Sequence, residues 1–197
     1  LQNVSNQNYF RETLSIPLLA PLLFYPPPLP AHAPDHAQQE HLTHKQAFLL
    51  QEWDEQKLAN AQLLLRCVRH LIDGQGEGHR SNQLVMCKTG LAEALVQLAM
   101  ASLAPLPLKA DALHVLASLL RGSRAAQDLI SAMVITPVVL KEHSVPAAEG
   151  LQPPMELAWQ SPHPAMLRLV EMALCVPIRP TDSPRMALRV RCAALQA

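Results

Sequence analysis

Apolar residues recur at helical spacing through most of this 197-residue chain. In residues 57–74, "KLANAQLLLRCVRHLIDG", they return every three or four positions, while the arginines fall largely on the opposite side. Residues 108–122 repeat this design. Each stretch ends at a glycine, Gly74 or Gly122, which is a residue that favours helix C-termini. The pattern therefore predicts two amphipathic helices with matching ends.

Similar stretches follow the two glycines. Residues 81–100 and residues 123–143 each predict a short helix, a break and a second apolar helix. The breaks are expected at Thr89–Gly90 and at Thr136–Pro137. The two stretches therefore look like copies of one structural unit.

The opening residues follow the same plan, because Ser-Asn-Gln occurs at 5–7 and again at 81–83. Ser5 and Ser81 are expected to cap the N-termini of their helices. Pro17 is placed to begin the helix after the break. We therefore interpret the tripeptide as the start of a repeated unit.

Gln7, Gln83 and Gln127 mark equivalent positions of the units, and the last two are 44 residues apart (127 minus 83). A period of ~40–47 residues with two or three helices per unit is typical of armadillo and HEAT arrays. Strand-like alternation is absent. We predict an all-α fold, an armadillo/HEAT-like α-solenoid forming a right-handed superhelix of two- to three-helix repeats.

Two segments interrupt the helical pattern. Residues 25–45 are rich in proline, histidine and polar residues, and they predict an inserted loop within the first, longer repeat interval. Residues 145–164 predict a second Pro-rich loop. The whole of residues 1–197 is expected to be part of one solenoid domain. Because the chain begins with Leu1 rather than Met, we expect a fragment of a longer protein.

Composition narrows the function. Aromatic residues make up only 4% of the chain, and its 16 basic and 16 acidic residues balance. Nucleic-acid binding is therefore not expected, since it requires a basic footprint or stacking surfaces. No apolar run reaches the ~18 residues of a membrane span. The four cysteines lack metal-site spacing and predict buried, reduced thiols: Cys67, Cys87, Cys175 and Cys192.

No motif predicts catalysis, a cofactor or a metal. The glycine-rich residues 73–80 lack the spacing of either phosphate-binding loop, so we interpret them as a linker between helices. Nucleophile motifs and paired carboxylates in a recognisable setting are missing. Four histidines cluster in the predicted loop, without a scaffold that would fix metal geometry: His32, His36, His41 and His44.

Protein binding is the function that remains. A solenoid presents the last helices of successive units as one long surface, and polar positions on those helices are candidate partner contacts. Two weaker candidates are the proline string at 26–30 and a basic cluster formed by Arg168, Arg185, Arg189 and Arg191. The polar positions of the last helices are Arg66, Arg69, His114 and Ser118.

Several stretches in order resemble the armadillo-like globular head of the general vesicular transport factor family, the Uso-type vesicle tethers. They include "LQNVSNQNYFRE", "WDEQKLANAQLLLRCVRHLI", "SNQLVMCKTGLAEALVQLAM" and the closing "LRVRCAALQA". The most specific pieces are residues 5–10 and Trp53 followed by residues 56–58. The insertion at 25–45 departs from the family pattern, and no binding residue is carried over.

The resemblance implies a non-enzymatic tether that docks transport vesicles before fusion, in endoplasmic-reticulum-to-Golgi and intra-Golgi transport. Rab-type GTPases, SNAREs and golgins or other tethering factors would be its partners. It would act in the cytoplasm, peripherally on Golgi and vesicle membranes, as a homodimer joined by a coiled-coil tail that this sequence lacks. The alternative is another armadillo/HEAT-repeat adaptor, such as a transport-receptor-like or ubiquitin-ligase scaffold.

Overall fold

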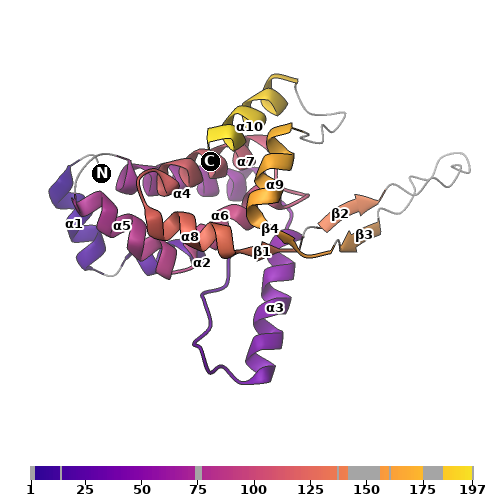
Figure 1. Cartoon of the computed structure of the whole chain (residues 1–197), viewed down its shortest axis with the longest axis horizontal. Helices are drawn as coiled ribbons and strands as arrows, with labels where there is room; N and C mark the ends of the chain where they lie inside the picture. Colours follow the sequence, from indigo (N-terminus) through magenta and orange to yellow (C-terminus); the bar gives the residue numbers. More distant parts are fainter. Residues whose placement is uncertain are drawn as a thin grey trace, which may run out of the picture.

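A computed structural model describes residues 3–13, 15–73, 77–136, 138–141, 156–159, 161–174 and 184–196. These residues form stacked helices and two short, two-stranded ribbons (Figure 1). The helices are α1 (Val4–Glu12), η1 (Ile16–Leu18), α2 (Leu19–Leu22), α3 (Asp35–Leu49), α4 (Glu55–Ile72), α5 (Glu77–Lys88), α6 (Leu91–Met100), α7 (Leu106–Leu120), α8 (Arg124–Ala132), α9 (Ala165–Leu174) and α10 (Pro184–Gln196). The strands are β1 (Val134–Ile135), β2 (Val138–Lys141), β3 (Glu156–Trp159) and β4 (His163–Pro164).

The predicted amphipathic helices are confirmed as α4 and α7. The periodic apolar side chains of α4 are buried, including Ala61, Leu65 and Val68. Asp54 caps this helix, because its side chain accepts a hydrogen bond of 2.7 Å from the backbone N–H of Lys57. The chain leaves α7 through Gly122, whose φ of 68° is the left-handed conformation typical of a helix C-terminus. Gly74 lies outside the described residues.

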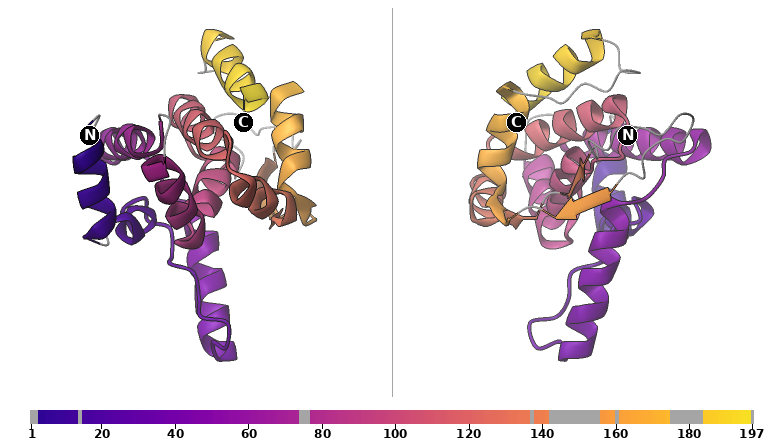
Figure 2. Two further views of the ribbon diagram at one scale, coloured as in Figure 1. Left: turned by 60° about the vertical axis from the view of Figure 1, so that its left-hand side comes forward. Right: turned by 90° about the vertical axis from the view of Figure 1, so that its right-hand side faces the viewer.

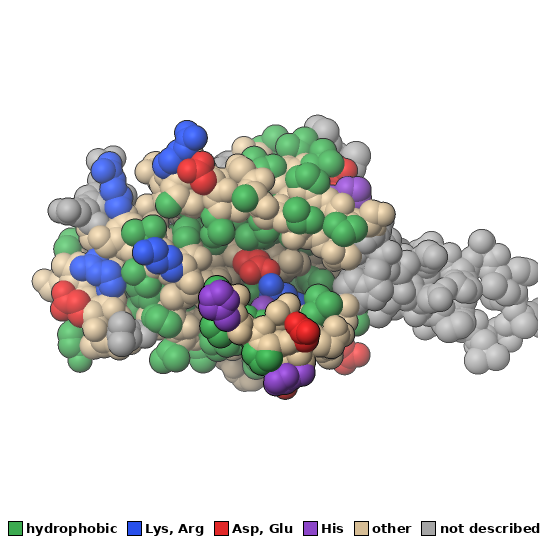
Figure 3. Space-filling model, turned by 60° about the horizontal axis from the view of Figure 1, so that its bottom comes forward, with side chains coloured by type: hydrophobic (Ala, Val, Ile, Leu, Met, Phe, Trp, Pro, Cys, Tyr) green, Lys and Arg blue, Asp and Glu red, His purple; other side chains and the backbone are tan. Residues whose placement is uncertain are grey.

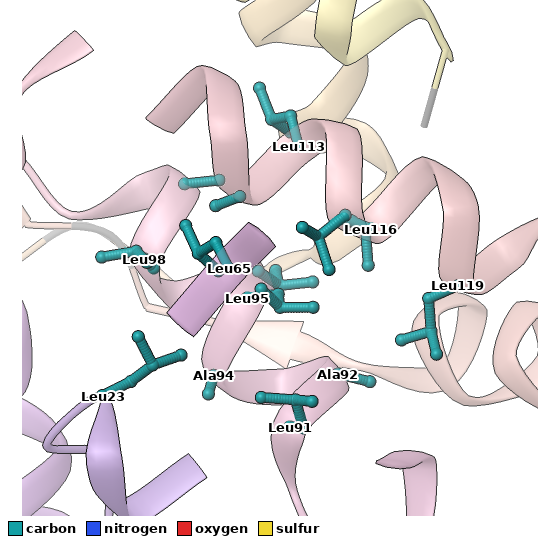
Figure 4. Close-up of a cluster of buried hydrophobic side chains, with 14 of the residues drawn as sticks. Leu23, Leu65, Leu91, Ala92, Ala94, Leu95, Leu98, Leu113, Leu116 and Leu119 are labelled. Atoms are coloured by element: carbon teal, nitrogen blue, oxygen red, sulfur yellow. The ribbon is translucent and has the colours of Figure 1, made fainter. Parts of the chain in front are cut away.

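Helices α6 and α7 form the centre of the molecule. α7 packs against α4, α6 and α10, so nearly all of its apolar side chains are buried. Leu65 of α4, Leu95 of α6 and Leu116 of α7 lie close together in this core (Figure 4). The helices stack as successive units, which confirms the predicted armadillo-like α-solenoid. No described helix combines the length and apolar content needed to span a bilayer.

Residues 25–45 are not a loop throughout, which corrects the prediction. From Asp35 onward they belong to α3, which projects away from the stack together with the extended residues before it (Figures 1 and 2). His41 Nε2 donates to the Pro27 carbonyl at 2.8 Å and ties the two halves of this arm together. The sequence pattern did not reveal the helix because most of α3 is exposed and needs no apolar stripe.

The root of the arm is buried in the stack. Tyr25 is 2% exposed, and its ring meets Phe48 edge-on at a centroid distance of 5.0 Å. Lys45 forms an ion pair of 2.6 Å with Glu93 of α6. The ion pair therefore fixes α3 against α6, and the aromatic packing fixes α3 against the residue that leads into the arm.

Two antiparallel ribbons replace the second apolar helix predicted after Thr136–Pro137, so that prediction is wrong. β1 pairs with β4, with Ile135 opposite His163, and β2 pairs with β3. β3 and β4 also lie within residues 145–164, which were expected to be a loop. Residues 145–155 are outside the described part of the chain. Strand formation here agrees with the run of Val138 and Val139, since β-branched residues favour strands.

The expected serine caps at the first two units are also wrong. Asn3 caps α1, because its Oδ1 accepts from the Ser5 N–H at 2.8 Å. Ser81 lies inside α5, which begins at Glu77 and so includes the end of the predicted glycine-rich linker. In the third unit, Ser123 does cap α8.

Candidate interaction surfaces

One carboxylate connects the last helices of three successive units. Asp111 of α7 accepts from Gln62 Nε2 of α4 at 3.2 Å through Oδ2. Its Oδ1 accepts from Arg189 Nη2 of α10 at 3.1 Å. The contacts fix α4, α7 and α10 side by side in register. This row is the long surface that a solenoid offers to partners.

Arg66 and Arg69 lie on the same side of α4 as Gln62, about one and two turns further along the helix. Both are exposed, and Arg69 Nε forms an ion pair of 3.5 Å with Asp73. Such an exposed pair holds its side chains only weakly. The two guanidinium groups therefore remain accessible to a partner.

Ser118 is not part of an accessible surface, which corrects its choice as a candidate. It is 5% exposed, and its backbone carbonyl accepts from Gln83 at 3.0 Å. His114, one turn earlier on α7, is half-buried. Sequence reasoning treated α7 as a surface helix because it carries polar residues. The structure covers it from both sides with α4 and α10.

The repeated glutamines bind the C-terminal ends of the last helices. Gln7 donates to the His70 carbonyl at 2.7 Å, Gln83 to those of Ser118 and Arg121, and Gln127 to that of Leu120 at 3.0 Å. The last carbonyls of a helix have no partner within it, and these side-chain amides provide donors for them. The Leu120 carbonyl also accepts from the Ser123 N–H at 3.3 Å. The Ser-Asn-Gln repeat is thus a structural element and not a binding site.

The predicted basic cluster is divided between two helices. Arg168 of α9 pairs with Glu171 of the same helix. Arg189 of α10 pairs with Asp111, while Arg185 on the same helix is exposed. The arginines therefore do not act as a single patch. On the face drawn in Figure 3, basic and acidic side chains are scattered among hydrophobic ones.

A hollow of about 380 Å³ opens between α7, α8 and α9. Among the described residues, its lining offers a guanidinium, a hydroxyl and an amide, but no carboxylate or imidazole that could act as a general base. It therefore resembles a small surface depression and not a reaction centre. The lining residues are Ala117, Leu120, Arg121, Gln127, Ile130, Ser131 and Met166.

Among the described residues, the surroundings shift the pKa values of two titratable groups. Burial, reinforced by the charge of Glu93, raises the pKa of Tyr25 far above that of a free tyrosine. Burial also raises the pKa of the Cys87 thiol, which makes it less reactive. Cys67 and Cys192 are free but exposed, so their predicted burial is wrong, and Cys175 lies outside the described residues.

The histidines of the arm are dispersed along it, with His32 before α3 and the other three on the helix. In the part of the chain that the structure describes, no three His, Cys, Asp or Glu side chains are grouped closely enough to hold a metal ion. His41 instead fastens the arm through its hydrogen bond to Pro27.

No family model matches this chain, and no curated protein matches it. Two solved structures, described as crystal structures of Uso1-2 and Uso1-1, share its fold with TM-scores of 0.64 and 0.63. Their sequences are 19% and 20% identical to it. Each alignment covers 98% of this chain and 24% of the solved one, so the chain spans about a quarter of their length. The expected resemblance to Uso1 is thus confirmed as a shared armadillo-like fold.

Proposed function

We propose that this chain is part of the solenoid head of a vesicle tether and acts by binding other proteins. The observation that carries the proposal is the Uso1-like fold along 98% of the chain at a TM-score of 0.64. The stretches that resemble the Uso-type tethers support the same assignment from the sequence. The role would be to dock transport vesicles before fusion in traffic between the endoplasmic reticulum and the Golgi and within the Golgi.

The binding surface we propose is the exposed face of α4 that carries Arg66 and Arg69. These cations are exposed on a helix that is itself fixed by the buried core. The Gln62–Asp111 contact holds α4 against α7, so the surface is formed before a partner arrives. His114, half-buried on α7, would lie at its edge. A Rab-type GTPase with an acidic face is the first partner to test, ahead of SNAREs and golgins.

The test is capture of the purified chain by a panel of immobilised Rab-type GTPases, each loaded with GDP or with a non-hydrolysable GTP analogue. We expect capture that depends on the GTP analogue. Arg66→Glu combined with Arg69→Glu should weaken it about tenfold, because each reversed charge opposes association. Arg80→Glu, an exposed arginine on α5, is the matched control. Equal capture in both nucleotide states, or none by any GTPase, would count against the proposal.

The same variants can be followed in cells. A tether head is expected to be recruited peripherally to Golgi and vesicle membranes, within a homodimer that a coiled-coil tail would hold together. We expect a fluorescent fusion of the chain to compete with endogenous tethers and to slow cargo transport out of the endoplasmic reticulum. Loss of this effect in the double variant, but not in Arg80→Glu, would link transport to the α4 surface.

A further inference from the structure

Helix α10 has two apolar faces, and only one of them is covered. Val190, Ala193 and Ala194 are buried, as expected for a helix packed on α7 and α9. On the opposite side, Leu188 is 61% exposed, Leu195 is 73% exposed, and Cys192 lies exposed between them. α10 lies at the outer edge of the stack (Figure 1). The outer stripe of Leu188, Cys192 and Leu195 is thus an apolar line without a neighbour among the described residues.

The spacing of this outer stripe is that of a helix–helix seam. Its members are four and then three positions apart, as at the d, a and d positions of a heptad. The stripe is only about one side chain wide. A helix that lies in a membrane surface instead needs a broad apolar face. A single partner helix is therefore the occupant that fits its shape.

Charge sets the chemistry of that partner helix. Arg189 and Arg191 flank the outer stripe on its two sides, at the positions that in a heptad seam face the charges of the partner. Arg185 adds a third cation one turn earlier, and the helix carries no acidic residue. Within the described residues, no carboxylate pairs with Arg185 or Arg191. The seam therefore complements glutamates and aspartates.

We propose that the outer stripe of α10 binds an acidic amphipathic helix of a partner protein. Apolar side chains of that helix, three or four positions apart, would cover Leu188, Cys192 and Leu195. Its flanking carboxylates would pair with Arg185 and Arg191, since Arg189 already forms an ion pair with Asp111 of α7. A second copy of this chain fits less well, because two α10 helices would bring like charges together. The binding site stands apart from the α4 surface and does not depend on a role in vesicle tethering.

The probe is a fluorescein-labelled synthetic peptide of about 21 residues, with leucines at heptad seam positions and glutamates beside them. Two control peptides have the leucines scrambled or the glutamates replaced by lysines. Fluorescence anisotropy with the purified chain should show saturable binding of the first peptide only. Binding should weaken as salt rises, because flanking ion pairs are screened.

Variants of the chain locate the site. We expect Leu188→Gln combined with Leu195→Gln to weaken binding of the acidic peptide at least about tenfold, since two apolar contacts are lost. Leu63→Gln, at a 58% exposed leucine on α4, is the matched control and should bind as the parent chain does. Circular dichroism should show the same helix content in all three proteins, because the altered side chains are exposed.

Five outcomes would overturn the proposal. The first three are no saturable binding of the acidic peptide, equal binding of the lysine peptide, and equal binding by the double variant. In the fourth, the chain binds phosphatidylserine vesicles but not the peptide, and the double variant no longer binds the vesicles. That result would assign the outer stripe to a membrane. Self-association that is lost in the double variant, seen by sedimentation, would likewise replace the partner helix with a second copy.

Discussion

The unit from α5 to α7 and the unit that begins at α8 each open with a glutamine that binds the end of α7, and they then diverge. Gln83 and Gln127 both donate to carbonyls at the end of α7. After the first helix, Gly90 turns the chain into α6, which is buried along most of its length. After α8, the chain instead forms β1 and the ribbons. A shared opening contact therefore does not dictate how a unit is completed.

Burial separates the two units further. Leu91, Leu95 and Leu98 of α6 are fully buried between neighbouring helices, whereas Met166, Leu167 and Val170 of α9 are each more than 40% exposed. Since buried apolar area is the main source of stability, the α5–α7 unit should be the thermodynamic centre of the molecule. Four measurements test this difference.

The largest effect should come from the core leucines. Leu95→Ala removes a fully buried side chain, and we expect it to lower the free energy of unfolding by about 3–4 kcal/mol. Leu167→Ala on α9, at 47% exposure, should cost less than about 1 kcal/mol. Urea unfolding followed by circular dichroism measures both. Equal losses would mean that the two units contribute alike.

Removal of the two glutamines should rank the units in the same order, with the larger loss of folding stability in the α5–α7 unit. Gln83 is 5% exposed and serves two carbonyls, so Gln83→Ala leaves buried acceptors unpaired and should cost about 2–3 kcal/mol. Gln127 is exposed and serves one carbonyl, which water can reach, so Gln127→Ala should cost less than about 1 kcal/mol. Thermal and urea unfolding of the pair provide the test. A greater loss in Gln127→Ala would reverse our ranking of the units.

The two glycines with positive φ provide a third comparison. Gly90 has φ of 81°, and a Cβ there would lie 3.2 Å from Pro28 Cδ at the base of the arm. Gly122 has φ of 68°, and its position is open. We expect Gly90→Ala to lower the free energy of unfolding by about 2 kcal/mol and Gly122→Ala by about 1 kcal/mol. An alanine is strained in the left-handed conformation at both positions, but only at Gly90 does its Cβ also press against the arm. Identical melting temperatures of the two variants would show that the arm moves aside for the new Cβ at position 90 without loss of stability.

The smallest effect concerns pH and the arm root that covers α6. Tyr25 stays protonated in the fold because its pKa is raised, whereas in the unfolded chain it ionises near its ordinary value of 10. The folded state then binds more protons, so this contribution to stability is intact below pH 10 and is lost as pH rises above it. The loss approaches about 1.4 kcal/mol per pH unit.

Tyr25→Phe isolates this contribution. Its stability should fall less steeply than that of the parent chain between pH 10 and pH 11, in urea titrations at matched ionic strength. Tyr9→Phe is the control, because that tyrosine is 70% exposed. Parallel curves for the parent chain and Tyr25→Phe would show that the phenol is not sealed from solvent.

The sequence by itself determined the helical solenoid. The apolar stripe of α4 and the left-handed Gly122 could be predicted from spacing and residue type. These features are local, since helical periodicity and glycine conformations depend on neighbours within a few positions. The exposed Arg66 and Arg69 followed from the same helical wheel.

Only the tertiary structure decided which polar residues remain accessible and how the two unusual segments fold. Ser118 lies on a helix that α4 and α10 enclose, and no local pattern reports such neighbours. The helix of the arm could not be predicted from an apolar stripe, because it projects into solvent and has none. β1 pairs with β4 across 27 intervening residues, between Ile135 and His163, and long-range pairing cannot be inferred from local periodicity. Burial and strand pairing depend on contacts between distant parts of the chain, whereas helix formation depends mainly on the sequence of the segment itself.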